Sequence, residues 1–241
     1  MKYALISDIH GNLAALDRVL QFLDSCEYDK LVCLGDIVGY GPDPNACCER
    51  IREKADIVLL GNHDQAAIGR MDISYFNRYA RQAIAWTGLR LQSECRSFLA
   101  DGLVQAEIDD ALCVHASPFE PENWHYVMSR IDALQAFQAF SQHTCFVGHS
   151  HAPMIAVEAN DTIVLQAGES LDLHPDNRYI INVGSVGQPR DTNPKACVGF
   201  YDSSDQTYKL IRLKYDIAET QEKMREQKLP QFLIERLAVG R

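Results

Sequence analysis

The alternation of apolar and polar segments in the first sixty residues predicts a parallel sheet covered by helices. Apolar runs typical of strands occupy Lys2–Ser7, Lys30–Leu34 and Ala55–Leu60. An amphipathic stretch, Asn12–Leu23, and a second helical segment, Pro44–Lys54, separate these runs. Strands that alternate with helices in this way form βαβ units, whose parallel strands are covered on both faces.

The remainder of the chain is predicted to be helical from about residue 65 to 100 and then rich in short strands. The strand-like ranges are Leu103–Glu107, Ala111–His115, Thr144–Val147, Met154–Val157, Thr162–Leu165, Tyr179–Val183, Val198–Tyr201 and Lys209–Leu213. A loop over 116–129 and a helix near 130–140 interrupt them, and the tail 216–239 is helical with a break near Pro230. Turn-separated strands after residue 150 indicate an antiparallel or mixed sheet. Because no linker or repeat divides the chain, we expect one two-layered α/β domain over residues 1–241.

Composition narrows the range of partners. The 241 residues carry a formal charge of −10, and 46% of them are hydrophobic, which is enough for a substantial core. A surface of this charge repels duplex nucleic acid and anionic membranes, and no basic run compensates. We therefore expect neither bulk nucleic-acid binding nor membrane association, and the oligomeric state stays open.

Cysteine usage favours a reduced, cytoplasmic protein. The eight cysteines have no C-x-x-C spacing, although their even number is compatible with four disulfides. Cys33, Cys113 and Cys145 lie inside apolar strand-like runs, where a free thiol behaves as a small hydrophobic group. The apolar run at the N-terminus is too short for a signal peptide, and no segment is long enough to span a membrane.

Side chains that can bind metals follow five of the predicted strands. These residues are Asp8, His10, Asp36, Asn62, His63, Asp64, His115, His149 and His151. In open α/β sheets, ligands bind at the carboxyl ends of the strands, so the fold is expected to gather these groups at one edge.

The residue types in this set are suited to first-row divalent metals. Imidazole, carboxylate and amide oxygen are their usual ligands, and the lack of cysteine argues against a closed structural zinc site. Asp8 and His10 are two residues apart and could face the same ion, and the same holds for His149 and His151. The two oxygens of Asp36 could bridge two ions about 3.5–4 Å apart.

The motifs differ in how specific they are. A single D-x-H is weak, and Gly-Asn alone is ordinary turn chemistry. G-N-H-D, at Gly61–Asp64, is expected by chance in fewer than about one chain in a thousand of this length. His125, His143 and His174 match no strand end, so we expect them on the surface or in loops.

Together these motifs resemble those of the calcineurin-like metallophosphoesterases. The resemblance rests on D-x-H (Asp8, His10), G-D (Gly35, Asp36), G-N-H-D (Gly61–Asp64), His115 and G-H-x-H (Gly148–His151). The N-V-G-S segment at Asn182–Ser185 is similar to the N-P-G-S turn of small prokaryotic members. The resemblance implies an α/β (α+β) fold, a four-layer αββα sandwich with two mixed β-sheets, and two divalent metal ions (Mn, Fe, Zn or Ni).

The same resemblance implies a role for each site residue. One metal ion would be held by Asp8, His10, Asp36 and His151, and the other by Asp36, Asn62, His115 and His149. Asn62 would bind through its carbonyl oxygen. Asn62 and His63 would contact the substrate phosphate, and His63 would assist departure of the leaving group. Asp64 would fix the tautomer of the His63 imidazole.

The residues that follow the G-D motif (Gly35, Asp36) distinguish this chain from one branch of the family. Ser/Thr protein phosphatases carry an arginine there, in G-D-x-x-D-R-G, whereas this chain reads GDIVGYG. The pattern is more similar to the small phosphodiesterase and phosphatase branch. It favours hydrolysis of a small nucleotide-type phosphoester, with a dinucleoside polyphosphate as one candidate, by attack of a metal-bridging hydroxide. A protein phosphatase and a non-catalytic binding scaffold are the alternatives.

Two further features have open interpretations. The helical insert near 65–100 carries Tyr75, Phe76, Arg78, Tyr79, Arg81 and Trp86. These residues could form a layer packed on the core, or a cap that stacks a base and contacts distal phosphates. Arg190, in GSVGQPRD, could bind a substrate phosphate, or it could be a surface residue paired with Asp191.

Overall fold

The structure is a computed structural model, and it describes residues 1–160, 162–167 and 169–241, with the side chain of Tyr75 excepted. The strands are β1 (Lys2–Ile6), β2 (Lys30–Cys33), β3 (Ile57–Val58), β4 (Gln105–Ile108), β5 (Ala111–Val114), β6 (Thr144–Val147), β7 (Met154–Ala159), β8 (Thr162–Gln166), β9 (Ser170–Asp172), β10 (Arg178–Asn182), β11 (Ala196–Asp202) and β12 (Thr207–Leu213). The α-helices are α1 (Leu13–Leu23), α2 (Pro44–Lys54), α3 (Asn62–Ala67), α4 (Arg78–Gly88), α5 (Ser93–Ala100), α6 (Arg130–Phe137), α7 (Ile217–Glu226) and α8 (Gln231–Val239). Two 3-10 turns, η1 (Ile73–Tyr75) and η2 (Pro121–Asn123), complete the elements of the described residues.

The strands form two mixed sheets. The first has the order β3-β2-β1-β11-β12-β9, and the second has the order β4-β5-β6-β10-β7-β8. In the first sheet, β1 is parallel to β2 and antiparallel to β11, so that Tyr3 lies opposite both Lys30 and Tyr201. In the second, β10 is parallel to β6 and antiparallel to β7. The predicted pair of mixed sheets is confirmed.

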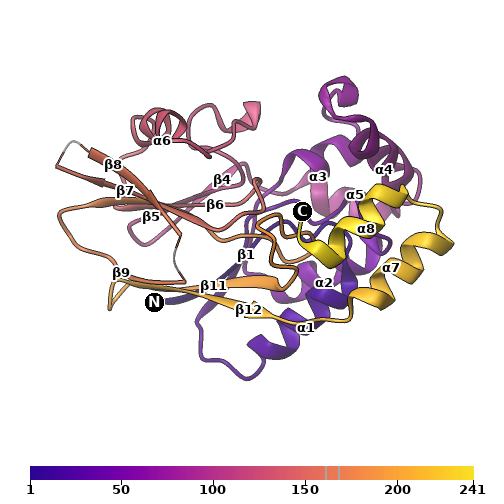
Figure 1. Ribbon diagram of the computed structural model, residues 1–241, viewed down its shortest axis with the longest axis horizontal. Helices are drawn as coiled ribbons and strands as arrows, with labels where there is room; N and C mark the ends of the chain where they lie inside the picture. The colour runs from indigo at the N-terminus through magenta and orange to yellow at the C-terminus, as the bar shows by residue number, and fades with distance from the viewer. Residues whose placement is uncertain (161, 168) are drawn as a thin grey trace.

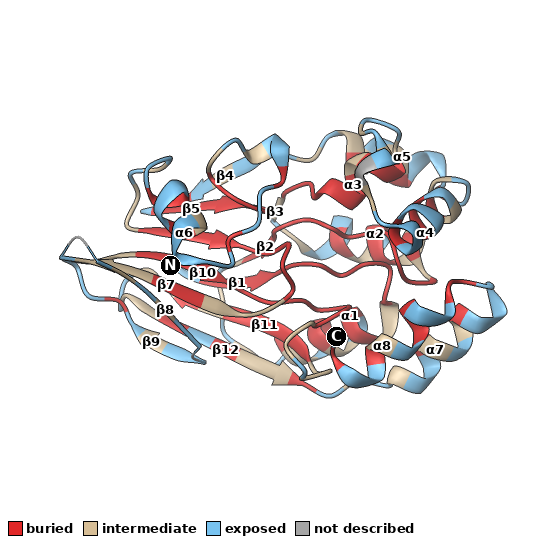
Figure 2. Ribbon diagram, turned by 45° about the horizontal axis from the view of Figure 1, so that its top comes forward, coloured by how far each residue is buried: buried red, intermediate tan, exposed pale blue. Residues whose placement is uncertain are grey.

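Helices cover the outer face of each sheet, and the inner faces pack against each other. Alternate residues of β1 show this division, because Leu5 joins the core between the sheets while Ile6 joins the core beneath α1 and α2. The outer face of the second sheet packs on Phe137 of α6. Figure 1 shows α6 and α1 on opposite outer sides of the two sheets, and the buried residues follow the strands in Figure 2.

The fold therefore has four layers, as the family resemblance implies, and the two-layer expectation from the strand pattern was wrong. The strands after residue 150 do not build one additional sheet. Instead β7, β8 and β10 extend the second sheet, while β9, β11 and β12 extend the first. Hydrophobic periodicity predicts that a segment is a strand but carries no information on which sheet it joins.

Local details depart from the prediction at three places. β3 has only two residues, because the chain turns from β2 toward Leu103 directly after it: the Leu59 amide still donates to Cys33 of β2, whereas the Leu60 amide donates to Leu103. Asn62 starts helix α3, so G-N-H-D is the first turn of a helix and not a loop. Strand β9 was missed, since three residues with alternating exposure carry too weak a pattern.

The helices of the 65–100 segment and the tail meet at one end of the sheets. Ala80 and Ala83 of α4, Met224 of α7 and Leu233 of α8 share one hydrophobic cluster with Tyr40. Figure 1 shows α7 and α8, in yellow, beside α4.

All eight cysteines are free thiols. None of the helices in the described ranges is both long enough and apolar enough to cross a bilayer.

Candidate functional site

The metal-capable residues predicted from the sequence lie together where the strands end. They follow β1, β2, β5 and β6 or belong to the first turn of α3. The buried members of the group are Asp8, His10, Asp36, Asn62, His63, Asp64, His115, His149 and His151. Residues up to 143 positions apart in the sequence therefore share one interior site.

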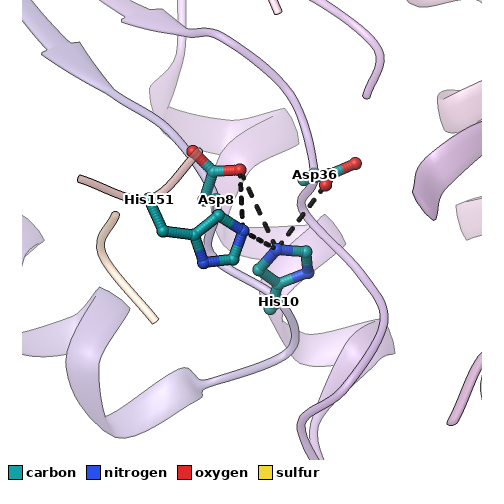
Figure 3. Close-up of side chains that lie close together, drawn as sticks. All are labelled: Asp8, His10, Asp36 and His151. Carbon is teal, nitrogen blue, oxygen red and sulfur yellow. Dashed lines mark hydrogen bonds and ion pairs between the residues drawn. The ribbon is translucent and has the colours of Figure 1, made fainter. Parts of the chain in front are cut away.

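A first subset consists of Asp8, His10, Asp36 and His151, each of which places one ligand atom within 4.8 Å of the others. Nε2 of His10 lies 3.0 Å from Nε2 of His151 and 3.5 Å from Oδ2 of Asp36. Nε2 of His151 lies 3.3 Å from Oδ1 of Asp8. Figure 3 shows the imidazoles of His10 and His151 next to each other, with the carboxylate of Asp8 close to both rings and that of Asp36 close to His10.

A second subset shares Asp36 with the first. Asp36, His115 and His149 also bring their ligand atoms within 4.8 Å of one another. Nε2 of His115 lies 3.4 Å from Oδ2 of Asp36, the same oxygen that faces His10. Asp36 thus stands between two groups of potential ligands, which is the position that a bridging carboxylate occupies in two-metal sites.

Several of these ligand atoms are buried without a hydrogen-bond partner among the described residues. They are Oδ1 of Asp8, Oδ2 of Asp36, Oδ1 of Asn62, Nε2 of His115 and Nε2 of His149. Most buried polar atoms in native proteins are hydrogen-bonded, so five unsatisfied atoms in one place call for a missing partner. All five carry lone pairs, and a cation satisfies lone pairs. The residues therefore fit divalent metal ions.

Backbone carbonyls set the tautomer of three of the histidines. Nδ1 of His10 lies 3.1 Å from the carbonyl of Val38, and Nδ1 of His115 lies 2.9 Å from that of Leu34. Nδ1 of His151 lies 2.6 Å from the carbonyl of Gln188. A carbonyl only accepts, so Nδ1 carries the proton and the Nε2 lone pair faces the site, as in metal-binding histidines.

The backbone at this site has an unusual conformation. Asp8, His10, Asp36, His149 and His151 have φ angles between 52° and 62°, in the left-handed region. Such angles are uncommon for residues other than glycine, although Asp and His are enriched there, and they persist only where the surroundings impose them. The D-x-H and H-x-H segments therefore turn both of their side chains toward one point.

Two of the motif glycines are required by close contacts. A Cβ atom on Gly61 would overlap Oδ1 of Asp36. A Cβ atom on Gly148 would overlap Oγ of Ser7 and would lie 2.6 Å from Oδ2 of Asp8. The glycines of G-N-H-D and G-H-S-H thus allow other segments to approach the two aspartates.

Burial and mutual charge shift the pKa values of these groups. Burial raises the pKa of Asp8 to about 7. Burial also acts against ionisation of Asp36, but the positive charge of His115 prevails and holds the pKa of Asp36 well below its usual range. Burial acts against charge on His115 too, yet Asp36 raises the pKa of His115 to about 9. The opposite shifts of these two pKa values reflect the distance of 3.4 Å between Oδ2 of Asp36 and Nε2 of His115.

The remaining histidines of the site are neutral. Burial lowers the pKa of His10 and His151 well below the ordinary value. It lowers the pKa of His149 to about 3 and that of His63 to about 4. Because metals bind the neutral imidazole, burial prepares His10, His149 and His151 for ligation.

The contact predicted between Asp64 and His63 is not present, which corrects that part of the prediction. Oδ1 of Asp64 accepts a hydrogen bond from the Val38 amide at 3.0 Å, and Oδ2 accepts one from the Gly61 amide at 3.1 Å. Nδ1 of His63 has no hydrogen-bond partner among the described residues. Asp64 therefore joins the start of α3 to the loop after β2 and does not set the tautomer of His63.

Aromatic rings, and not Asp64, pack against the imidazole of His63. The ring centre of His63 lies 4.4 Å from that of Tyr40 and 4.8 Å from that of His10. Phe76 makes an edge contact at 5.1 Å. Sequence reasoning missed Tyr40, although it follows Asp36 by only four residues in the same loop.

Arg190 lies beside the site. Its backbone amide donates to the carbonyl of His151 at 3.0 Å, and its guanidinium donates to Oε1 of Gln188 at 2.8 Å. The alternative, a surface pair with Asp191, is wrong because Asp191 pairs with Arg212. Binding of a phosphate by Arg190 stays a prediction.

A cavity of about 910 Å³ opens over these residues. Its floor includes Asp36, Asn62, His63, His149 and His151, and its walls include Tyr40, Phe76, Asn77, Glu122, Asn123, Trp124, Tyr126, Arg190, Phe232 and Arg236. Tyr126 stacks on His149 with ring centres 4.1 Å apart. No motif in the sequence indicated Trp124, Tyr126, Phe232 or Arg236.

The 65–100 segment contributes little of its predicted aromatic and basic surface to this cavity. Phe76 lines the cavity, whereas Trp86 packs beneath the guanidinium of Arg90 at 4.2 Å. Arg78 and Arg81 are exposed. The side chain of Tyr75 lies outside the described residues.

The three histidines that match no strand end are not among the site residues. His125 is exposed and pairs with Glu120, His143 is half-buried and His174 is exposed.

Comparison with known proteins adds independent findings. Residues 1–206 match the model of the calcineurin-like phosphoesterase superfamily domain. An uncharacterized protein of Methanocaldococcus jannaschii is 39% identical over 244 residues, covering 99% of this chain and 98% of that protein. Phosphodiesterase YfcE of Escherichia coli K12 is 27% identical over 214 residues, covering 84% and 88% of the two chains. The crystal structure of a metallophosphoesterase from Sphaerobacter thermophilus is similar with a TM-score of 0.87 and 43% identity, covering 100% and 99%.

Proposed function

The chain belongs to the calcineurin-like phosphoesterase superfamily and is a phosphoric ester hydrolase, and we propose that it acts with two divalent metal ions on a small nucleotide-type phosphoester. The observation that supports this most is the position of Asp36. It belongs to both subsets of potential ligands, and its Oδ2 is buried without a hydrogen-bond partner among the described residues.

The proposed ligand sets follow the two subsets. Asp8, His10, Asp36 and His151 would hold one ion, and Asp36, Asn62, His115 and His149 would hold the other. Manganese, iron, zinc and nickel all accept such a mixture of imidazole and oxygen ligands. Bound there, two ions would supply an activated water nucleophile and neutralise charge that develops on the phosphoryl oxygens.

His63 is proposed to act on the leaving group. It lies on the cavity floor beside the ligand sets, and Tyr40 and Phe76 hold its ring in place. Because burial lowers its pKa to about 4, the imidazole is neutral near pH 7 and acts as a hydrogen-bond donor to the leaving oxygen. Asn62 would bind an ion through its carbonyl oxygen and contact the substrate with its amide.

The cavity walls support a small substrate with an aromatic part. Its volume of about 910 Å³ is in the range of pockets for ligands of nucleotide size. Trp124 and Tyr126 offer aromatic surface to the cavity, and Arg190 offers a positive charge. The similarity to phosphodiesterase YfcE supports a diester, and the same site also suits monoesters.

Metal content and turnover test this proposal together. Metal-free protein would be loaded with Mn²⁺, Zn²⁺ or Ni²⁺, or with Fe²⁺ without oxygen, analysed for bound metal, and assayed with bis(p-nitrophenyl) phosphate and p-nitrophenyl phosphate. We expect two ions per chain and hydrolysis that a chelator abolishes. Hydrolysis without metal would refute the proposal. Metal binding without turnover of any ester would favour the scaffold, and exclusive turnover of phosphopeptides would favour a protein phosphatase.

A further inference from the structure

A second arginine lines the cavity on the same side as Arg190. Arg236 belongs to α8, and its guanidinium lies 5.3 Å from the ring centre of Phe232, which also lines the cavity. We propose that Arg190 and Arg236 together form an anion subsite that binds a second, non-reacting phosphate group of the substrate. This inference rests on the proposed function, because it assigns the reacting phosphate to the metal site.

Among the described residues, no Asp or Glu side chain pairs with either arginine. Elsewhere in the chain Arg50, Arg178, Arg212 and Arg225 each pair with a carboxylate. Arg190 donates to the amide oxygen of Gln188, whereas Arg236 donates to a carboxylate oxygen of Arg241, the last residue of the chain.

The two guanidinium groups also repel each other. Burial and the charge of Arg190 together lower the pKa of Arg236 to about 10. Like charges at a partly buried position destabilise a fold unless a counter-ion bridges them. A phosphate between two guanidinium groups removes this repulsion and accepts charge-assisted hydrogen bonds from both.

The proposed subsite lies close to the metal-capable residues but does not include any of them. The guanidinium of Arg190 lies 5.6 Å from the ring centre of Tyr40, and that ring in turn packs on His63 and His10. The same ring of Tyr40 thus contacts the guanidinium of Arg190 and the imidazoles of His10 and His63. A substrate that reaches both must carry its second phosphate at some distance from the reacting one.

The charged residues that line the cavity favour one orientation of the bound substrate. Arg190 and Arg236 are the basic residues among those that line the cavity, and Glu122 of η2 is an acidic one. An anionic end is therefore favoured at the arginines. α8 is anchored by Leu233, which joins the cluster with α4 and α7, so Arg236 is presented from a packed helix.

Arg236 lies outside the region shared with the whole family. The family model ends at residue 206, and α8 begins at Gln231. The subsite therefore combines one arginine from the family domain with one from the following helices. It selects nucleoside bisphosphates and polyphosphates, including dinucleoside polyphosphates, over esters with a single phosphate.

A matched pair of nucleotides tests the subsite. Adenosine 5′-monophosphate and adenosine 3′,5′-bisphosphate would be compared as competitive inhibitors of bis(p-nitrophenyl) phosphate hydrolysis. Direct calorimetric titration of the metal-loaded protein would measure the same binding without turnover. We expect the bisphosphate to bind at least about 10-fold more tightly, which is the scale of one charge-assisted hydrogen bond. Arg236→Gln should bring the two affinities to within about 2-fold, and Arg236→Lys should retain part of the preference.

The control is Arg225→Gln, which removes an exposed arginine paired with Glu222 on α7 and should keep the wild-type preference. The melting temperature of each variant shows that it is folded. Equal binding of both nucleotides by the wild type, or an unchanged preference in Arg236→Gln, would overturn the subsite. Absence of turnover with every ester would instead count against the proposed function, and calorimetry would still decide on the subsite.

Discussion

The end of the sheets and the helices above it form two different kinds of surface around one cavity. At the strand ends the site residues are buried, five of them have left-handed backbone angles, and backbone carbonyls fix three of the imidazoles. Around the opening the side chains are more exposed, as Phe232 and Tyr126 show with 48% and 47% of their surface accessible.

Because of this difference, we expect the buried residues at the strand ends to serve the reaction and the exposed residues around the opening to determine which substrate binds. Atoms that hold metals need fixed positions, and the strand ends provide them through several segments that constrain one another. Groups that recognise the variable part of a substrate need only a wall of suitable shape and charge. Substitutions in the two regions should therefore have effects of different size and kind.

The largest effect is expected for Asp36→Asn. A neutral amide bridges two cations poorly, so the variant should lose most bound metal and at least about 10³-fold in kcat, since removal of one electrostatic group alone commonly costs 10²–10³. Metal analysis and turnover of an aryl phosphate measure both. Asp17→Asn, which alters an exposed carboxylate paired with Arg50, is the control. Two ions per chain and wild-type turnover in Asp36→Asn would remove the basis of the two-metal proposal.

His63→Ala should act on chemistry without removing metal. We expect kcat to fall by about 10²–10⁴-fold, because this is the usual contribution of a general acid or base. The loss should be smaller for substrates with good leaving groups, which a series of aryl phosphates can show. His125→Ala removes an exposed histidine and serves as the control. A large loss of metal from His63→Ala would make His63 a ligand.

Arg190→Lys should have a smaller effect that depends on the substrate. Lysine keeps the charge but loses the planar, bidentate geometry, so substrates with extra phosphates should lose about 10-fold in kcat/KM. A small aryl phosphate should lose less. Arg81→Lys, on the exposed face of α4, is the matched control. Equal losses on both substrates, or none on either, would return Arg190 to a structural role.

The smallest effect is expected for Tyr79→Ala, outside the cavity. Its ring stacks on Phe232 at 4.8 Å, and such pairs contribute about 0.5–1.5 kcal/mol. The free energy of unfolding, measured in denaturant at constant metal concentration, should fall by this amount while metal content stays unchanged. Leu89→Ala, at an 86% exposed position, should change neither quantity. Loss of metal from Tyr79→Ala would show that the two regions are not independent.

The sequence was most informative where local pattern and chemistry coincide. Asp8, Asp36 and His149 follow apolar runs, and the rule that parallel strands end at one edge was sufficient to bring them together. The helix Pro44–Lys54 was predicted to the residue, since Pro44 marks its start and extended backbone begins at its C-cap, Ala55.

It was least informative where a side chain acts through a partner that is distant in sequence. Asp64 was paired with its neighbour His63, but its oxygens bond to the amides of Gly61 and Val38. Arg236 lies 46 residues after Arg190, and nothing in the local pattern of α8 distinguishes it from a solvated arginine. Such contacts depend on how helices pack around the opening, which periodicity does not encode.

The position of β1 has a consequence for the order of events during synthesis. Asp8 follows β1, yet Gly187 and Ser185 bond to its backbone carbonyl and β1 pairs with β11. When the ribosome has produced the first 151 residues, every predicted ligand exists, but β11 and the segment with Ser185 and Gly187 do not. The nascent chain can therefore complete the proposed metal site only after β11 (Ala196–Asp202) has emerged from the ribosome.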